Sequence, residues 1–394
     1  MPITLPSGTV PLRSLTTGEV LYGDRVTSYR WEVLAHSGGT DSLVGYLDGV
    51  VDGSASLSWT LNTAVKGAGN LKVADLDKAQ PGFLRISDVA LSSARLRPVL
   101  VIEGLPEIPL GVYLVSAAPE EWTAAGRVYS IELLDRASVL DQDELDASYT
   151  VSTATPILSA VASVIAAGGE SIVVDATVTS TLTSPLTWPV GTTRLQIVND
   201  LLSALNYNSL WVDGVGNFRA TPYVVPAKRS IRYELLNMDR ELVDGEESIY
   251  QPEWNRDIDM FDVPNKVIAV QTGTGSAEPL VGTWTNTDPA SPFSYPSRGR
   301  WISKTISGVE TPAGTNPEVI AFLQARARQS LIAYSAVQGE VQVKHLPIPI
   351  RVSDVLRFAS TPAGIDARHT VTSVKLAASP LGLMETKLQE VIDL

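Results

Sequence analysis

Short apolar runs separated by turn residues dominate the first third of the sequence. We expect strands at residues 29–34, 55–61, 71–73, 83–86, 97–103, 109–115 and 126–134. Apolar and polar side chains alternate most clearly in 55–61, which is the period of a half-buried strand. Glycine and proline clusters at 37–40, 67–70 and 104–109 interrupt the runs at the spacing of an all-β fold. The pattern predicts a tube-like β-barrel over residues 1–147.

Helical spacing replaces this alternation at residue 156. Thr155 stands in an N-cap position, Pro156 would occupy the first helical position, and Gly168-Gly169 supplies the end of the helix. The apolar residues of 156–167 recur at intervals of three and four, which places them on one buried face. They are Ile157, Leu158, Val161, Val164 and Ile165.

A second helix and a hairpin follow in residues 188–223. Thr193 and Gln196 have the spacing of a capping box, in which each side chain bonds a free backbone N–H group. The apolar stripe of the helix, which ends near Asn206, consists of Leu195, Val198, Leu201, Leu202 and Leu205. Two short strand-like runs, 210–212 and 218–221, flank the glycine-rich sequence DGVGN of a hairpin turn. We predict a small α+β module over 148–238, with both helices packed on the hairpin of Trp211 and Phe218.

The last part, residues 239–394, returns to strand patterns after the acidic stretch 239–253. We expect strands at 263–272, 301–307, 339–344, 352–358, 370–376 and 384–391. A helix begins at Asn316-Pro317 and ends near Tyr334, and its buried face carries Val319, Leu323, Ala327 and Leu331. Residues 273–300 are too long and polar for a tight loop and indicate an insertion or a contact loop. The predicted fold is mainly β with α+β: two tube-like β-barrels bracket the small module, and the helix lies across the side of the second barrel.

The charge and the residue content exclude several classes of function. The net charge is −13, of which −8 falls in residues 1–146. Because an acidic surface repels phosphate backbones, we expect no specific binding of nucleic acid. The chain has no cysteine, so it has neither disulfides nor a thiolate nucleophile nor a cysteine-bound zinc. No apolar run approaches about 20 residues and no signal-peptide pattern opens the chain, so we expect no stable membrane association.

Candidate catalytic and metal-binding residues do not form a recognisable constellation. His36, His345 and His369 are far apart, no HExxH or G-x-S-x-G motif occurs, and no glycine is followed by lysine as a P-loop requires. Two acidic clusters would be the remaining route to a glycosidase pair or a calcium site: Asp141, Asp143, Glu144 and Asp146, and then Asp257, Asp259 and Asp262. Charge runs are usually solvated, so we assign no catalytic, cofactor-binding or metal-binding residue.

Four aromatic residues lie in or beside the long polar loop: Trp284, Phe293, Tyr295 and Trp301. Exposed Trp and Tyr side chains can form a carbohydrate-binding face, but a loop that packs on its own barrel also needs them. We favour packing because large aromatic side chains bury much apolar area. A contact between subunits stays open as a third interpretation.

The helix and hairpin also carry a resemblance to a known family. The sequences WPVGTTRLQIVNDLL and NYNSLWVDGVGNFRATPY resemble the middle module of the tail hub proteins of tailed bacteriophages. These hubs are similar to the baseplate hub of contractile-tailed phages and to the N-terminal part of siphophage tail-associated lysins. The resemblance implies a tube-like barrel at each end of the chain. In a trimer, two barrels per chain would present six similar units and so adapt a six-fold tail tube to a three-fold tip.

The resemblance also implies partners and a location. A hub joins the tail tube or distal tail protein to tip proteins or tail fibres. It is plugged by the end of the tape-measure protein, and DNA touches it only in passage through the channel. We therefore expect a non-enzymatic virion protein of the tail tip or baseplate, assembled in the host cytoplasm. Many siphophage homologues continue into a peptidase or fibre domain, whereas this sequence stops at Leu394. We therefore expect any lytic or receptor-binding activity to belong to another protein.

A tail-tip component that binds or hydrolyses cell-wall glycan is the competing interpretation. In it, the 273–300 loop would bind the glycan and an acidic pair that includes Asp143 would cleave it.

Overall fold

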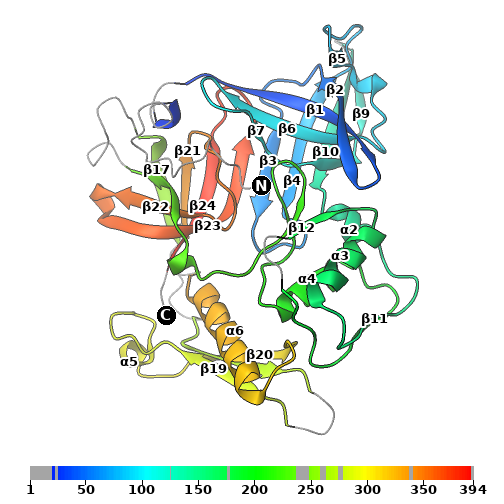
Figure 1. The fold of residues 1–394 in the computed structure, drawn as a ribbon. Helices are drawn as coiled ribbons and strands as arrows, with labels where there is room; N and C mark the ends of the chain where they lie inside the picture. The colour runs from blue at the N-terminus through cyan, green and yellow to red at the C-terminus, as the bar shows by residue number, and fades with distance from the viewer. Residues whose placement is uncertain are drawn as a thin grey trace.

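The described residues fold mainly into β-strands, which confirms the predicted fold class. The computed structural model describes residues 20–22, 25–124, 126–174, 178–236, 248–257, 263–273, 278–336 and 340–391. Figure 1 shows a large sheet, with two smaller units that lie on the same side of it. We call these three parts the large sheet, the middle unit (138–220) and the α6 unit (266–336).

The large sheet joins strands from both ends of the chain. In the described residues it has 16 strands, and its main path runs β17-β21-β24-β23-β3-β4-β10-β8-β6-β1-β2-β5. The first region supplies β1 (Thr27–Ser37), β2 (Thr40–Leu47), β3 (Ser56–Thr60), β4 (Gly67–Ala74), β5 (Phe83–Leu84), β6 (Arg95–Ile102), β7 (Ile108–Pro109), β8 (Tyr113–Ala117), β9 (Glu120–Thr123) and β10 (Gly126–Asp135). The last region supplies β16 (Ile231–Leu235), β17 (Tyr250–Asp257), β21 (Glu340–His345), β22 (Val355–Ser360), β23 (Ile365–Ala377) and β24 (Met384–Glu390).

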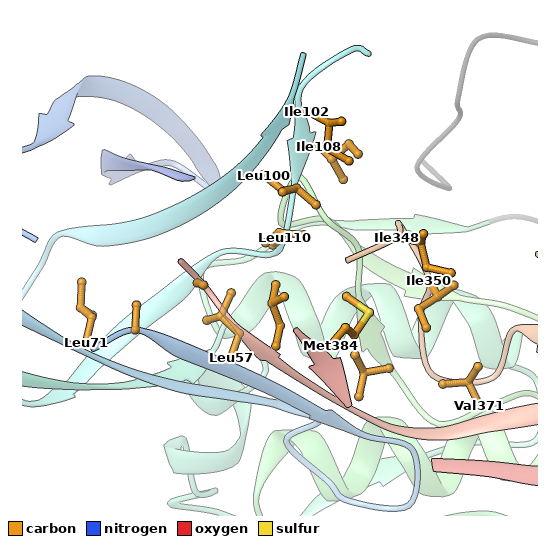
Figure 2. Packing of buried hydrophobic residues seen from close by; sticks show 14 of the residues in the cluster. Leu57, Leu71, Leu100, Ile102, Ile108, Leu110, Ile348, Ile350, Val371 and Met384 are labelled. Carbon is orange, nitrogen blue, oxygen red and sulfur yellow. The ribbon is translucent and has the colours of Figure 1, made fainter. Parts of the chain in front are cut away.

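The two strand-rich regions meet where β3 pairs with β23. This antiparallel pair aligns Ser56 with Ala377 and Thr60 with Ser373. Side chains from both regions share one apolar core, and Figure 2 shows Leu57 beside Met384 in it. The hydrogen-bonded network thus crosses both regions, and a division into two separate tube-like barrels stays a prediction.

Two features of the first region differ from the expectations. The sequence pattern does not predict β2 or β9. Most of their side chains are exposed, so apolar and polar residues do not alternate along them. Residues 67–70, expected as a break, are the first half of β4. A Cβ atom at Gly69 would lie 2.7 Å from Leu57 Cδ2, so this glycine permits close packing of β3 on β4 rather than a turn.

The middle unit has its own apolar core beneath the large sheet. Its elements are α2 (Ser138–Gln142), β11 (Tyr149–Val151), α3 (Ile157–Ala167), β12 (Ile172–Val174), β13 (Leu186–Trp188), α4 (Arg194–Ala204), β14 (Trp211–Val212) and β15 (Phe218–Ala220). Phe218 of the hairpin belongs to the same core as both helices, as expected, whereas Trp211, which we expected there too, is only partly buried and lies outside this core. Leu140 and Leu145, which precede the expected boundary at residue 147, also pack here.

The ends of the two helices follow the sequence signals with one shift. Thr193 is the N-cap of α4, and its Oγ1 accepts the Gln196 N–H at 3.2 Å, which is half of the predicted capping box. Pro156 is the N-cap of α3 and not its first helical residue. The helix ends at Gly168, and Gly169 has the left-handed conformation expected after a helix.

The α6 unit contains β18 (Lys266–Gln271), β19 (Val281–Thr285), α5 (Tyr295–Arg298), β20 (Ser303–Val309) and α6 (Asn316–Ala336). Its strands form a separate sheet in the order β19-β18-β20. The predicted apolar face of α6 packs on this sheet, so the helix does not cross the strands β21 to β24. Glu318 Oε2 accepts the Thr315 N–H at 2.7 Å, which caps the helix one residue earlier than the Asn316-Pro317 start that we expected.

Short 3-10 turns occur at Ile86–Asp88, Pro226–Lys228 and Thr361–Ala363. Among the helices of the described ranges, none combines the length and the apolar content that a membrane crossing requires.

Candidate functional site where the three units meet

The glycine-rich turn of the β14–β15 hairpin presses against the large sheet. The Asp213 carboxylate accepts the backbone N–H groups of Val215 and Asn217 at 3.1 and 2.9 Å, which orders the turn. The Gly214 carbonyl accepts the Gly111 N–H at 2.9 Å. A Cβ atom at position 214 would lie 2.3 Å from the carbonyl oxygen of residue 109, so only glycine permits this approach. The turn therefore joins the middle unit to the large sheet.

A buried group of charges lies beside this turn, and we call it the Glu170 cluster (His36, Asp41, Arg95, Arg136 and Glu170). Arg95 Nη2 lies 2.6 Å from Glu170 Oε1, and Arg136 binds the other oxygen through Nε, at 2.9 Å, and through Nη2. Asp41 lies 3.1 Å from each arginine, and His36 Nδ1 lies 2.7 Å from Asp41. The Glu170 side chain is only 1% exposed. Each buried charge of the cluster has an opposite charge as its partner.

Arg136 connects the units through this cluster. Its Nη1 donates to the Gly216 carbonyl at 2.8 Å, and its Nη2 donates to the Gly39 carbonyl at 3.2 Å. Its guanidinium also lies over the ring of Phe218, 5.6 Å from the centroid. The β1–β2 turn, the end of α3 and the hairpin turn therefore share one cation.

The units enclose a cleft of about 860 Å³, which we call the central cleft. Its walls come from the large sheet, the middle unit, residues 226–232 and α6. Six basic side chains line it, which are Lys66, Arg219, Arg229, Arg232, Arg326 and Arg351, against four acidic ones, Asp135, Asp213, Asp354 and Glu390. The wall thus has an excess of basic groups, although the chain carries a net charge of −13.

The carboxylates of the central cleft are bound to groups of the protein itself. Asp135 accepts two backbone N–H groups at 2.5 and 2.8 Å. Asp354 accepts one at 2.9 Å and lies 3.8 Å from Arg232 Nε. Glu390 lies 3.2 Å from Arg256, and Asp213 orders the hairpin turn. Burial raises the pKa of Asp135 to about 6 and also raises the pKa of Asp354.

Arg229 and Arg326 bind only neutral acceptors among the described residues. Arg229 donates to the Ser353 carbonyl and hydroxyl at 2.7 and 2.6 Å, and to a second backbone carbonyl at 2.7 Å. Arg326 donates to Ser203 Oγ at 3.0 Å and to Gln329 Oε1 at 2.9 Å, while its buried Nε has no hydrogen-bond partner in the described part of the chain. Burial lowers the pKa of both guanidiniums because it removes water from the charged form. Among the described residues no carboxylate forms a direct contact with either cation, in contrast to the Glu170 cluster, although Asp354 acts on Arg229 at longer range.

The cleft wall also carries apolar and aromatic side chains, together with neutral polar ones such as Asn199 and Asn208. Trp59 and Tyr113 come from the large sheet, Ile350 from the connection between β21 and β22, and Trp211 from the hairpin. The Arg351 guanidinium lies over the Trp211 ring, 5.3 Å from its centroid. The cleft therefore offers both cations and apolar surface to a bound group.

The histidines and the first acidic cluster from the sequence are dispersed. His345 Nε2 lies 2.8 Å from Thr386 Oγ1 in the large sheet, His369 is buried in β23, and His36 belongs to the Glu170 cluster. Asp143 pairs with Arg194 at 2.5 Å, while Asp141, Glu144 and Asp146 are exposed at the edge of the middle unit. Within the described ranges no group of three His, Asp or Glu side chains is placed to hold a metal.

The second acidic cluster is not described. Asp259 and Asp262 lie outside the described residues, and the Asp257 backbone ends β17.

The four aromatic residues of the long loop divide into two pairs. Trp284 lies in β19 against the α6 core, and Phe293 is buried. Tyr295 and Trp301 are 39% and 44% exposed and stack on each other, with ring centroids 4.4 Å apart. Packing accounts for the first pair, while the stacked pair presents an exposed aromatic edge.

The arrangement of the whole chain matches solved structures. The tail protein from Neisseria meningitidis MC58 aligns with a TM-score of 0.62 at 14% identity, over 92% of this chain and 97% of that one. This chain has the fold of phage tail proteins. The 43 kDa tail protein of prophage MuSo2 from Shewanella oneidensis aligns with a TM-score of 0.57 at 14% identity, over 91% and 98% of the two chains. A prophage tail protein from Listeria monocytogenes aligns with a TM-score of 0.51 at 13% identity, over 91% and 94%. No known protein family matches the sequence, and no curated protein matches it.

The sequence did not point to the arginines of this tail-protein fold. Arg229 and Arg326 are separated by almost a hundred residues, and no pattern in the sequence connects them. The available signal was the short basic stretch 228–232, with Lys228, Arg229 and Arg232, in an otherwise acidic chain.

Proposed function

We propose that the chain is a structural tail hub protein of a long-tailed bacteriophage or prophage. One observation carries this proposal: solved tail proteins share its fold over 91–92% of this chain and 94–98% of their own length. The helix and hairpin of 188–223, which resemble the hub family, supply the turn that joins the middle unit to the large sheet. The hub function therefore rests on the complete fold and on the local motif together.

The proposed mechanism is geometric and involves no catalysis. Three chains would form a ring, in which the two strand-rich regions of each chain present six similar units to a six-fold tail tube. The ring would bind the tail tube or distal tail protein on one side and tip proteins or fibres on the other. The tape-measure protein would fill the channel until DNA passes, and an acidic surface would not retain that DNA. The protein would reside in the tail tip or baseplate of the virion after assembly in the host cytoplasm.

The glycan-cleaving alternative has weaker support in the geometry. Asp143 pairs with Arg194, and its acidic neighbours in the cluster are exposed at the edge of the unit, outside the central cleft. The Tyr295 and Trp301 rings cover one face of each other, which leaves less ring surface for a sugar. We therefore place the protein among structural components and not among hydrolases.

Electron microscopy of the purified chain tests the hub proposal. We expect rings with a central channel and three-fold symmetry at high concentration, and a trimer mass by native mass spectrometry. Compact particles without a channel, at concentrations that match packed virions, would contradict the proposal.

A cell-wall assay tests the alternative. We expect no release of reducing sugar from purified host walls by the wild-type chain. Release that Asp143→Asn abolishes and the neighbouring Asp146→Asn leaves intact would establish a hydrolase and overturn the structural role.

A further inference from the structure

We propose that the central cleft binds an extended peptide segment of a partner protein that carries both carboxylate and apolar side chains. The chemistry of the cleft wall carries this inference. If the proposed hub function is correct, the partner is another tail component, and this identity alone rests on the proposed function. Arg229 and Arg326 bind the carboxylates, while Trp211 and its apolar neighbours bind the other side chains.

The two arginines act on the same part of the cleft. Arg229 lies over the Tyr223 ring, 5.5 Å from its centroid. Tyr223, Arg229 and Arg326 all line the cleft. Burial raises the pKa of the Tyr223 phenol, against the opposing effect of the Arg229, Arg328 and Arg326 cations. A carboxylate near Tyr223 would therefore meet two cations and a neutral phenol that can donate a hydrogen bond. Hydrogen bonds between charged groups are shorter and stronger than those to the neutral acceptors now present.

The energetic argument concerns how a buried cation is compensated. Arginine cannot lose its proton in a protein, so a guanidinium without water needs an opposite charge. In the Glu170 cluster that charge is internal, whereas the four carboxylates of the cleft are bound to backbone N–H groups or to other arginines. An acidic ligand would supply the missing charge. The neutral partners of Arg229 and Arg326 hold their side chains in place before binding, which reduces the entropy lost on association.

The walls favour a peptide over a nucleic acid. Phosphate backbones are recognised by extended basic surfaces, but this basic excess is confined to one cleft of a chain with net charge −13. Aromatic and aliphatic side chains such as Trp59 and Ile350 line the same cleft as the cations. A cleft of about 860 Å³ holds a group the size of a small organic ligand, which corresponds to a short stretch of a bound chain.

Peptide selection followed by a binding measurement tests the inference on the whole chain. Random heptapeptides on beads are selected against the wild-type chain and against a variant with Arg229→Gln and Arg326→Gln. We expect the wild-type chain to enrich sequences with Asp or Glu next to aliphatic or aromatic residues, and the double variant not to do so. Fluorescence anisotropy with the most enriched peptide should show an affinity about tenfold to hundredfold lower for the double variant.

Matched variants separate recognition from folding. Arg326→Lys keeps the charge and should retain most of the affinity, whereas Arg326→Gln should not. Arg85→Gln removes an exposed arginine outside the cleft that pairs with Asp88, and should leave binding unchanged. Circular dichroism of each variant confirms that it is folded before binding is measured.

Three outcomes would overturn the inference. One is enrichment of peptides without carboxylates, or equal binding by the wild-type chain and the folded double variant. Another is tighter binding of single-stranded DNA or inorganic phosphate than of the selected peptide, which would indicate a phosphate site. The third is self-association that the double variant loses, which would assign the cleft to a second copy of the chain. The binding assay uses the unassembled chain and does not depend on ring formation. Absence of rings would contradict the hub proposal, whereas absence of peptide binding would contradict the cleft proposal.

Discussion

Arg136 and Arg326 both lie where the units of this protein meet, and their surroundings differ in one respect. Arg136 is 5% exposed and contacts two carboxylates, those of Glu170 and Asp41. Arg326 lies on the wall of a cleft and donates only to hydroxyl and amide oxygens. The same residue type is therefore neutralised by carboxylates in one place and binds neutral groups at the wall of an open cleft in the other.

The difference indicates which charges serve the fold and which serve a ligand. Removing a charge from water is costly, and an internal partner repays that cost only when its geometry is good. The Glu170 cluster meets this condition with contacts of 2.6 to 3.1 Å. In the central cleft, Arg229 and Arg326 have no such carboxylate contact among the described residues. Burial nevertheless removes water from both guanidiniums and lowers their pKa. A cation that the fold leaves without an opposite charge is a candidate contact for an acidic partner.

Arg136→Met should have the largest effect on stability. It leaves Glu170 and Asp41 with one arginine in place of two, and breaking a buried pair in this way costs about 3–5 kcal/mol. Urea unfolding gives the free energy of unfolding of the variant and of the wild type. Arg85→Met is the control, because it breaks an exposed pair with Asp88, and exposed pairs contribute little to stability. Equal losses in the two variants would refute the assigned role of the cluster.

Asp135 is a buried carboxyl group of the cleft that, unlike an arginine, can become neutral, so its effect on stability should depend on pH. Burial raises its folded-state pKa from 3.8 to about 6, so the folded chain binds more protons than the unfolded chain between these values. Stability from this group is complete below about pH 4 and is lost as the pH rises through about 6, by about 3 kcal/mol in total. The free energy of unfolding of the wild type, measured relative to that of Asp135→Asn, should therefore fall as the pH rises over this range. A difference that does not change with pH would contradict the shift.

Gly214→Ala should weaken the contact between the hairpin turn and the large sheet. The new Cβ atom would lie 2.3 Å from the carbonyl oxygen of residue 109, so the turn must move. Overpacking of this kind costs about 1–3 kcal/mol, which thermal or urea unfolding detects. Gly273→Ala is a matched control, because no atom of the described residues lies within 4 Å of its Cβ position. Equal stability of the two variants would show that the turn does not need the close approach.

Arg326→Met should have the smallest effect, and this result completes the comparison with Arg136→Met. The variant loses hydrogen bonds to neutral acceptors but also removes a partly buried charge, so we expect a change of no more than about 1 kcal/mol. The same urea titrations measure it. A loss as large as that of Arg136→Met would show that Arg326 supports the fold, and would remove the main argument for a ligand in the cleft.

Local signals predicted the helices of the middle unit well. The spacing of Thr193 and Gln196 set the start of α4, and the glycine pair after residue 167 set the end of α3. These features depend on neighbours within four residues, so the sequence displays them directly. The signal was weaker where one residue type has two uses, as at Gly69, which permits close packing and does not make a turn.

The candidate site could not be predicted in the same way. Arg136 meets Glu170 across 34 positions of the chain and Asp41 across 95, and no periodic pattern connects them. The cleft combines residues from Trp59 to Glu390, and its character depends on which carboxylates are already bound elsewhere. Composition even suggested the opposite sign of charge, since the chain as a whole is acidic.

The sequence by itself determined the mainly β composition, the two capped helices, the hairpin with its glycine-rich turn and the absence of cysteine chemistry. Each depends on contacts between near neighbours or on residue content alone. Only the tertiary structure decided that β3 pairs with β23, that α6 packs on its own sheet, and that one set of arginines is neutralised while another lines a cleft. These outcomes depend on which distant side chains meet, because the strength of a buried charge interaction is set by distance and by loss of water and not by order along the chain.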